Sequence, residues 1–295
     1  RSPTKDCFTA HIVVPARSAR LEPFPDWVSP GLAGAFARGG VEQLYRHQRL
    51  SADATRRGED VVVVTPTASG KTLCYNLPVL QTILETPEAR AFYLFPTKAL
   101  SQDQVASLQR TIDALDVPVR TFTYDGDTPT NTRRKLRDEG NIILTNPDMR
   151  HQGIIPNHTR CGEFFSSLKY VVIDEIHAYR GIFGYNVANV IRRLTRICRH
   201  YGTNPQFICC SATIANPQEL AENLTGVSLT TITGDHDGSP KGPKSFVLWN
   251  PPYLDDSMVE RRAANSDARD LMVELIRRRF PTIAFVRTRN GAELL

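Results

Sequence analysis

The sequence predicts an α/β fold in which a mainly parallel sheet is flanked by helices on both faces. Short runs of β-branched and aromatic residues alternate with longer segments of helical periodicity. The runs are apolar at nearly every position, and each ends abruptly in a polar or glycine- and proline-containing segment. Strands that are apolar on both sides are buried on both sides, which is typical of parallel sheets with helical connections.

Six of these runs are expected to form strands, and each leads into a polar segment. The runs cover residues 61–64, 91–95, 119–124, 142–144, 170–173 and 207–210. The polar segments begin at Thr65, Pro96, Asp125, Thr145, Asp174 and Ser211. Because ligands bind outside the carboxyl ends of the strands in such sheets, we expect all six segments to lie on one rim of the domain.

The chain is expected to contain one complete domain and part of a second, since 295 residues exceed an average domain. We assign residues 1–40 to an N-terminal lead segment, 41–240 to the complete domain, and 241–295 to a linker and the start of the second domain. A seventh strand is expected at 228–232, then a glycine-, proline- and charge-rich linker at 234–243, and further strands at 246–249 and 282–286. The sequence does not begin with methionine, and it stops just after a strand-like run. We therefore expect a fragment of a longer protein.

Composition is that of an ordinary globular protein, with 41% hydrophobic and 23% charged residues. No apolar run is long enough to span a membrane and no secretory signal is visible, so we expect an intracellular protein without a membrane partner.

The six cysteines lack zinc-ligand spacing and predict reduced, mostly buried thiols. The net charge of +5 is modest. An amphipathic helix with a solvated basic face is expected around Arg192, Arg193, Arg196 and Arg199.

Residues 65–72 have the spacing of a phosphate-binding loop, G-x-x-x-x-G-K-[ST], with Thr65 in place of the first glycine. In such a loop, backbone N–H groups hold phosphate oxygens, the lysine contacts the β- and γ-phosphates, and the hydroxyl binds Mg²⁺. A chance Gly-Lys-Thr turn is the alternative, but the all-valine run before it and the helical pattern after it favour the loop. The expected nucleotide-binding residues are Thr67, Ala68, Ser69, Gly70, Lys71 and Thr72.

Two adjacent acidic residues, Asp174 and Glu175, end the expected strand at 170–173. One carboxylate can hold Mg²⁺, and the other can orient and deprotonate an attacking water. Such pairs also occur at strand ends without a catalytic role, and the phosphate loop favours the catalytic interpretation. His177 is a weaker signal, because a lone histidine is more often a surface or core residue.

The joint order of these segments resembles the DExH-box branch of superfamily 2 helicases. Motifs I, Ia, Ib, II and III correspond to residues 65–72, 96–100, 145–148, 174–177 and 211–213, and 285–289 resembles motif IV. Details such as Tyr-Asp-Gly-Asp-Thr at 124–128 are similar to the MrfA/YprA group of bacterial DNA-repair helicases, which are related to the RecQ family. The resemblance covers residues 41–290, and it implies a RecA-like, P-loop NTPase domain in the bacterial cytoplasm, followed by the start of a second RecA-like domain.

The resemblance also implies roles for individual residues. Gln48 would recognise adenine, although it could instead be an ordinary surface glutamine. Trp27, Phe36 and Tyr45 are candidates to stack on the base, and all three could instead be core residues. His177, together with Ser211 and Thr213, would couple the state of the γ-phosphate to the DNA side. The residues implied to contact DNA are Thr97, Lys98, Gly126, Asp127, Thr145, Asn146, Arg287 and Arg289. Gly126 and Asp127 would shape a loop near the DNA strand, and each of the other six could instead be a strand-end cap or a solvated surface residue.

The implied activity is that of an ATP-dependent DNA helicase or translocase, with ATP and Mg²⁺ as cofactors. It would act on single-stranded or forked DNA, with 3′ to 5′ movement and a role in DNA repair. Zinc is implied only for a C-terminal domain outside this sequence. The arginines of motif VI also lie outside it, so we expect residues 1–295 alone to hydrolyse ATP poorly.

The alternatives are an ATP-dependent RNA helicase and a DNA translocase that does not separate strands. An inactive scaffold is disfavoured, because Lys71, Thr72, Asp174 and Glu175 are all present.

Overall fold

The computed structural model describes residues 7–115, 117–124, 139–146, 155–254 and 259–294. The chain divides into two compact units, one of Ser18–Pro240 and the other of Arg1–Arg17 with Lys241–Leu295. Residues 1–40, which we expected to form one lead segment, are therefore divided between the two units. Whether these units act as separate domains stays a prediction.

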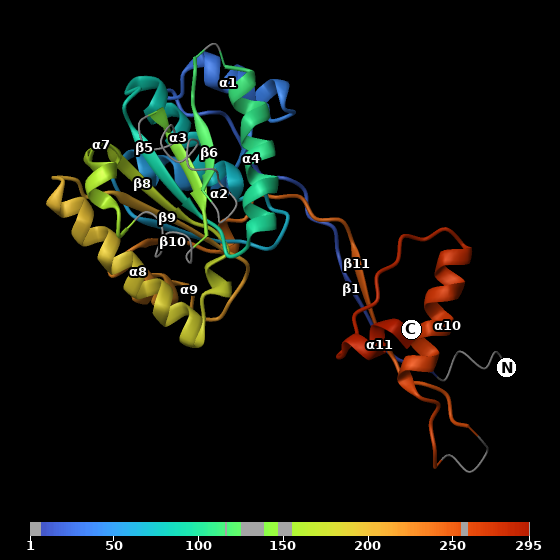
Figure 1. The fold of residues 1–295 in the computed structure, drawn as a ribbon. Coiled ribbons are helices and arrows are strands. Elements are labelled where there is room, and N and C mark those ends of the chain that lie inside the picture. The colour runs from blue at the N-terminus through green and yellow to red at the C-terminus, as the bar shows by residue number, and fades with distance from the viewer. Residues whose placement is uncertain (1–6, 116, 125–138, 147–154, 255–258, 295) are drawn as a thin grey trace. The chain divides into compact units, whose positions relative to one another are not determined.

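A seven-stranded sheet forms the centre of the larger unit (Figure 1). Its strands are β4 (Val61–Val64), β5 (Arg90–Leu94), β6 (Thr121–Tyr124), β7 (Ile142–Thr145), β8 (Leu168–Ile173), β9 (Gln206–Ser211) and β10 (Thr230–Ile232). Their order across the sheet is β10-β4-β9-β8-β5-β7-β6, and every neighbouring pair is parallel. All seven strands expected in this part of the chain are present, and the predicted fold class is confirmed.

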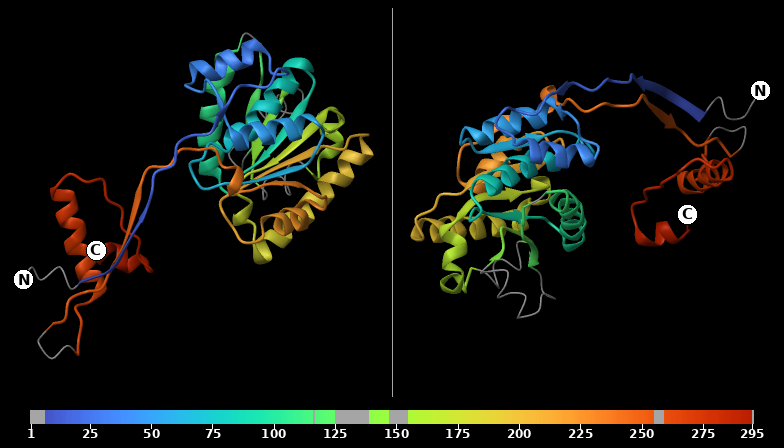
Figure 2. Two further views of the ribbon diagram at one scale, coloured as in Figure 1. Left: turned by 180° about the vertical axis from the view of Figure 1, so that it is seen from behind. Right: turned by 90° about the horizontal axis from the view of Figure 1, so that it is seen from above.

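Helices cover both faces of this sheet (Figure 2). On one face lie α1 (Pro30–Arg38), α2 (Arg46–Arg56), α3 (Thr72–Glu85) and α4 (Lys98–Asp113), and on the other lie α7 (Gly162–Ser166), α8 (Gly181–His200) and α9 (Pro217–Thr225). In β4, Val61 and Val63 pack in the first layer, whereas Val62 and Val64 pack in the second. Successive strand side chains point to opposite faces, so a strand buried on both sides needs an apolar residue at every position. A short antiparallel pair, β2 (Leu21–Glu22) with β3 (Leu44–Tyr45), completes this unit.

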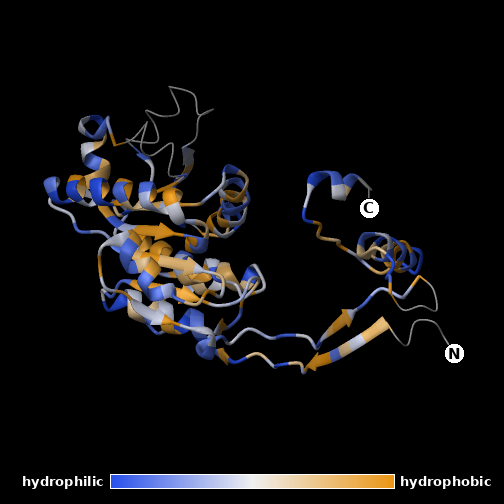
Figure 3. Ribbon diagram, turned by 90° about the horizontal axis from the view of Figure 1, so that it is seen from below, coloured by the Kyte–Doolittle hydropathy of each residue, from blue (hydrophilic) through white to orange (hydrophobic). Residues whose placement is uncertain are grey.

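The helix α8 has the amphipathic character that the sequence predicts. Ile191 and Leu194 are fully buried, whereas Arg192, Arg196 and Arg199 are exposed. Figure 3 shows the same division, with hydrophobic residues along the strands and hydrophilic residues on the outer surfaces of the helices. All six cysteines are buried. In the described part of the chain, no helix combines the length and the apolar character needed to cross a membrane.

The smaller unit contains an antiparallel ribbon of β1 (Phe8–Val14) and β11 (Lys244–Trp249), followed by α10 (Ala264–Arg277) and α11 (Arg289–Leu294). The strand expected at 246–249 is present, but the strand expected at 282–286 was a wrong prediction. Those residues have no regular secondary structure, and Ile283 and Phe285 are 76% and 88% exposed. A strand needs a neighbour to pair its backbone groups, and no strand in the described ranges pairs with this run.

Candidate active site

The polar segments of the larger unit lie along one edge of the sheet, as expected for parallel strands. The register aligns Val64 with Ser211, and Leu94 with both Ile173 and Thr145. The strand order divides this edge into two halves. The neighbours β4, β9 and β8 carry the phosphate loop, residues 211–213 and the acidic pair, whereas β5 and β7 carry the described candidate DNA contacts of this unit.

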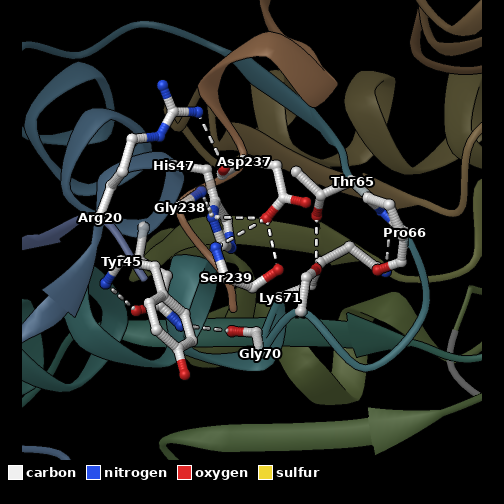
Figure 4. A network of polar contacts seen from close by, with 12 residues as sticks. Arg20, Tyr45, His47, Thr65, Pro66, Gly70, Lys71, Asp237, Gly238 and Ser239 are labelled. Atoms are coloured by element: carbon white, nitrogen blue, oxygen red, sulfur yellow. Dashed lines mark hydrogen bonds and ion pairs between the residues drawn. The ribbon is translucent and has the colours of Figure 1, made fainter. Parts of the chain in front are cut away.

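The phosphate loop is closed by contacts among its own residues. Its backbone takes left-handed conformations at Ala68 (φ 61°) and Gly70 (φ 77°). The hydroxyls of Thr65 and Ser69 are hydrogen bonded at 2.7 Å. Nζ of Lys71, a residue that is 8% exposed, donates to the carbonyl oxygens of Thr65 and Pro66 at 3.1 Å each (Figure 4). These contacts hold a positive charge beside the N-terminus of α3, and a positive charge and a helix N-terminus both attract phosphate.

Gln48 ties the beginning of α2 to this loop. Its Nε2 donates to the carbonyl oxygen of Gly70 at 2.9 Å, and its Oε1 accepts the N–H of Tyr45 at 2.8 Å. A Cβ at position 70 would lie 2.7 Å from that Nε2, and the positive φ also disfavours any other residue there. The amide keeps one further N–H and one further lone pair. Its predicted contact with adenine can therefore be made without breaking either bond.

A pocket of about 560 Å³ lies beside Gln48 and the loop. Of the three aromatic residues considered for stacking on a base, Phe36 and Tyr45 line this pocket. Trp27 is not among the lining residues. Its Nε1 donates to Asp53 at 3.0 Å, and the guanidinium of Arg56 lies 5.4 Å from its ring centroid. Phe36 is only 5% exposed and its ring stacks on Phe24 with centroids 6.2 Å apart, so it belongs to the core. The structure therefore favours Tyr45, which is half-buried, as the candidate.

Asp174 is a buried carboxylate, 6% exposed, at the end of β8. Its Oδ1 accepts the N–H of Glu175 at 2.8 Å. Burial, together with repulsion from the neighbouring Glu175, raises the pKa of Asp174 to about 6. A divalent cation would relieve both effects. Magnesium usually takes only one or two carboxylates and keeps several waters. The Thr72 hydroxyl donates to Gln104 Oε1 at 3.4 Å. Asp174 with this hydroxyl stays the predicted Mg²⁺ pair, and the described residues hold no group of three His, Cys, Asp or Glu side chains that could bind a metal.

The sequence reasoning missed Tyr75, which orients Asp174. The Tyr75 hydroxyl donates to Asp174 Oδ2 at 3.0 Å, and burial raises the pKa of Tyr75 well above its ordinary value, which keeps the hydroxyl protonated. Tyr75 lies three residues after Thr72 in α3, and residues three apart in a helix share a face. Helical periodicity could therefore have placed Tyr75 near the loop, but the sequence does not show which side chain faces it.

His177 links the acidic pair to residues 211–213. Glu175 has a left-handed backbone (φ 51°), and its Oε2 lies 3.1 Å from His177 Nδ1. The same Nδ1 accepts the backbone N–H of Ala212 at 3.4 Å. We expected Ser211 and Thr213 to take part, but the hydrogen bond is made by the residue between them. Ser211 is buried and Thr213 is exposed.

The candidate DNA contacts on β5 and β7 differ in what their side chains do. Thr97 is exposed and caps α4, since its Oγ1 accepts the N–H of Leu100 at 3.3 Å. Its hydroxyl proton stays available to a phosphate. Thr145 is 1% exposed and donates its hydroxyl to the carbonyl oxygen of Tyr124 at 2.7 Å. The Thr145 side chain is therefore used within the protein.

The other candidate DNA contacts are placed as follows. Lys98 and Asn146 are half-buried at the start of α4 and just after β7. Gly126 and Asp127 lie outside the described residues. Arg287 and Arg289 are exposed and belong to the smaller unit.

Comparison with known proteins gives consistent matches. Residues 45–220 match the model of the DEAD/DEAH box helicase family. The chain is 49% identical to the uncharacterized ATP-dependent helicase YprA of Bacillus subtilis, over 95% of the chain and 37% of that protein. It is 42% identical to the ATP-dependent helicase hrq1 of Schizosaccharomyces pombe, over 86% of the chain and 24% of that protein. A crystal structure of the DUF1998 helicase MrfA bound to DNA and AMPPNP has a TM-score of 0.92 and 47% identity, covering 98% of this chain and 40% of that one. The chain thus spans less than half the length of these proteins.

Proposed function

The chain belongs to the DEAD/DEAH box helicase family, as its motifs suggested, and we propose that it is the ATP-binding part of a DNA helicase. The helicase moves 3′ to 5′ along single-stranded or forked DNA in the bacterial cytoplasm and acts in DNA repair. One observation carries the proposal: the phosphate loop, the acidic pair and the candidate DNA contacts of the larger unit share one sheet edge, and His177 joins two of its segments. The similar helicase MrfA, crystallised bound to both DNA and AMPPNP, supports the choice of ligands.

In the proposed mechanism, Mg²⁺-ATP supplies the phosphoryl group and part of the charge neutralisation at the loop. Lys71 and the N–H groups of the loop hold the phosphates, and Thr72 and Asp174 hold the metal. Glu175 orients the attacking water and accepts its proton. Residues 41–240 form the first RecA-like domain, and 241–295 contain the linker and the beginning of the second.

Nucleic-acid-stimulated hydrolysis by the intact protein tests the proposed function. We expect single-stranded DNA to stimulate ATP hydrolysis strongly, RNA of the same sequence to stimulate it weakly, and a fluorescent forked duplex to be separated only when ATP is present. Equal stimulation by RNA would favour an RNA helicase. Stimulation by DNA without strand separation would favour a translocase, and no response to either polymer would overturn the proposal.

Replacing His177 with alanine is expected to uncouple hydrolysis from DNA. The substitution removes the contacts of the imidazole with Ala212 and with Glu175, while the Glu175 carboxylate and Lys71 are themselves unchanged. Coupling free energies between sites are typically about 1–3 kcal/mol, so we expect DNA stimulation to fall about tenfold while the basal rate changes less than about threefold. Steady-state phosphate release with and without DNA measures both. The exposed His200 on α8 provides a matched control, His200→Ala. An equal loss of basal and stimulated rates would instead indicate a role in the chemical step.

A further inference from the structure

Part of the stretch expected to be an open linker is packed inside the larger unit. Asp237 and Ser239 are 0% and 4% exposed, and Gly238 between them is also buried. A buried carboxylate is costly unless polar groups surround it. Residues 237–239 therefore do more than connect the two units.

Asp237 organises this segment through its Oδ1 atom. That oxygen accepts the N–H of Ser239 at 2.9 Å and the Ser239 hydroxyl at 2.6 Å. It also lies 3.7 Å from His47 Nδ1, and this nitrogen accepts the N–H of Gly238 at 3.3 Å. The carboxylate and the backbone next to it thus contact the imidazole of His47 directly (Figure 4).

The backbone around Gly238 is held against two other segments. Arg20 donates its N–H to the Gly238 carbonyl oxygen at 2.9 Å, and its guanidinium donates to the carbonyl oxygens of Asp235 and Asp237 at 2.7 and 2.8 Å. A Cβ at Gly238 would lie 2.5 Å from the backbone nitrogen of Arg46 and 2.6 Å from the carbonyl oxygen of Arg20. These neighbours are backbone atoms, so Gly238 packs directly against the start of α2 and no larger residue fits there.

A continuous series of contacts leads from His47 to the phosphate loop. The rings of His47 and Tyr45 stack with centroids 5.9 Å apart and an interplanar angle of 22°. Tyr45 lines the pocket beside the loop and donates its N–H to Gln48, which donates in turn to Gly70. Every residue in this series lies within the larger unit.

We propose that residues 237–239 position Tyr45 and Gln48 for recognition of the base, and thereby set the affinity for ATP. This inference rests on the proposed function of the site. Asp237 acts through His47 and is a positioning residue. A buried carboxylate whose oxygen accepts two hydrogen bonds is held in one arrangement and restricts its neighbours. Misplacement of a recognition group by about 1 Å is enough to weaken a site.

The test replaces Asp237 with alanine in the intact protein and measures ATP hydrolysis against ATP concentration. We expect the KM for ATP to rise about tenfold and kcat to change less than about twofold, because base recognition is lost while the reacting groups stay in place. Asp237→Asn keeps the Oδ1 acceptor, so it should restore KM to within about threefold of the unmodified protein. Asp235→Ala is the matched control, since this exposed side chain lies two residues away and carries the same charge.

The controls separate the two proposals. If the unmodified protein hydrolyses ATP and Lys71→Ala does not, but Asp237→Ala has an unchanged KM, the positioning role is overturned and the proposed function stands. A fall in kcat at constant KM also overturns the positioning role. If the unmodified protein has no ATP hydrolysis, both proposals fall. If thermal unfolding shows that Asp237→Ala is not folded, the positioning role is tested with Ser239→Ala instead. This substitution removes one hydrogen-bond donor to the Asp237 carboxylate. Its KM should rise about threefold, and an unchanged value would overturn the inference.

Discussion

Replacing Lys71 with alanine in the intact protein is expected to lower kcat for ATP hydrolysis by about 10³-fold or more and to weaken ATP binding. The Lys71 ammonium is held within the phosphate loop by the carbonyl oxygens of Thr65 and Pro66. These oxygens are neutral, so the positive charge is available to a triphosphate. Alanine removes this charge together with the two hydrogen bonds from Nζ, whereas the bond between the Thr65 and Ser69 hydroxyls remains.

The measurements are steady-state phosphate release and binding of a fluorescent ATP analogue. Lys169→Ala is the control, because Lys169 is an exposed lysine on β8 and the substitution changes the net charge by the same amount. An unchanged melting temperature in both variants shows that the fold survives. Hydrolysis by Lys71→Ala at more than about a tenth of the normal rate would contradict the assigned role, since removal of even one stabilising donor typically costs about 10²–10³ in kcat.

Much of the fold could be predicted because the strands are uniformly apolar. In β4 all four residues are valine and all four are buried, which leaves little ambiguity between a strand and a surface helix. The order of the strands in the sheet, by contrast, could not be predicted from the sequence. β4 pairs with β9, about 145 residues later in the chain, and no local pattern encodes that pairing. The division of the sheet edge into two halves therefore emerged only from the structure.

The sequence says less about the candidate site where contacts depend on backbone atoms. Residues 211–213 were singled out by their order and spacing after a strand, with Ser211 and Thr213 as the expected coupling residues. The contact to His177 in the structure uses the N–H of Ala212, which any residue but proline could provide. Residues 237–239 were interpreted as linker because glycine, proline and charged residues are common in loops. Their burial depends on Arg20 and His47, which are remote in sequence, and composition cannot reveal such partners.

Replacing Glu175 with glutamine is expected to lower kcat by about 10³-fold while ATP binding changes less than about twofold. Glutamine keeps the size and shape of the side chain but cannot accept a proton from the attacking water. Binding should persist because the phosphate loop and Asp174 are untouched. Repulsion from the Glu175 carboxylate contributes to the raised pKa of Asp174. Glutamine removes this repulsion, so the substitution does not weaken the ability of Asp174 to hold Mg²⁺.

This outcome separates Glu175 from Lys71, since the lysine substitution impairs binding and hydrolysis together. Single-turnover hydrolysis and AMPPNP binding by the intact protein distinguish the two patterns, and the exposed Glu163 on α7 supplies the control, Glu163→Gln. If Glu175→Gln hydrolysed ATP normally, proton transfer would have to involve another group. Among the carboxylates described next to the loop, Asp174 is the alternative. Its bonds to Tyr75 and to the Glu175 N–H suit it better to holding a cation, because both donors stabilise the ionised form.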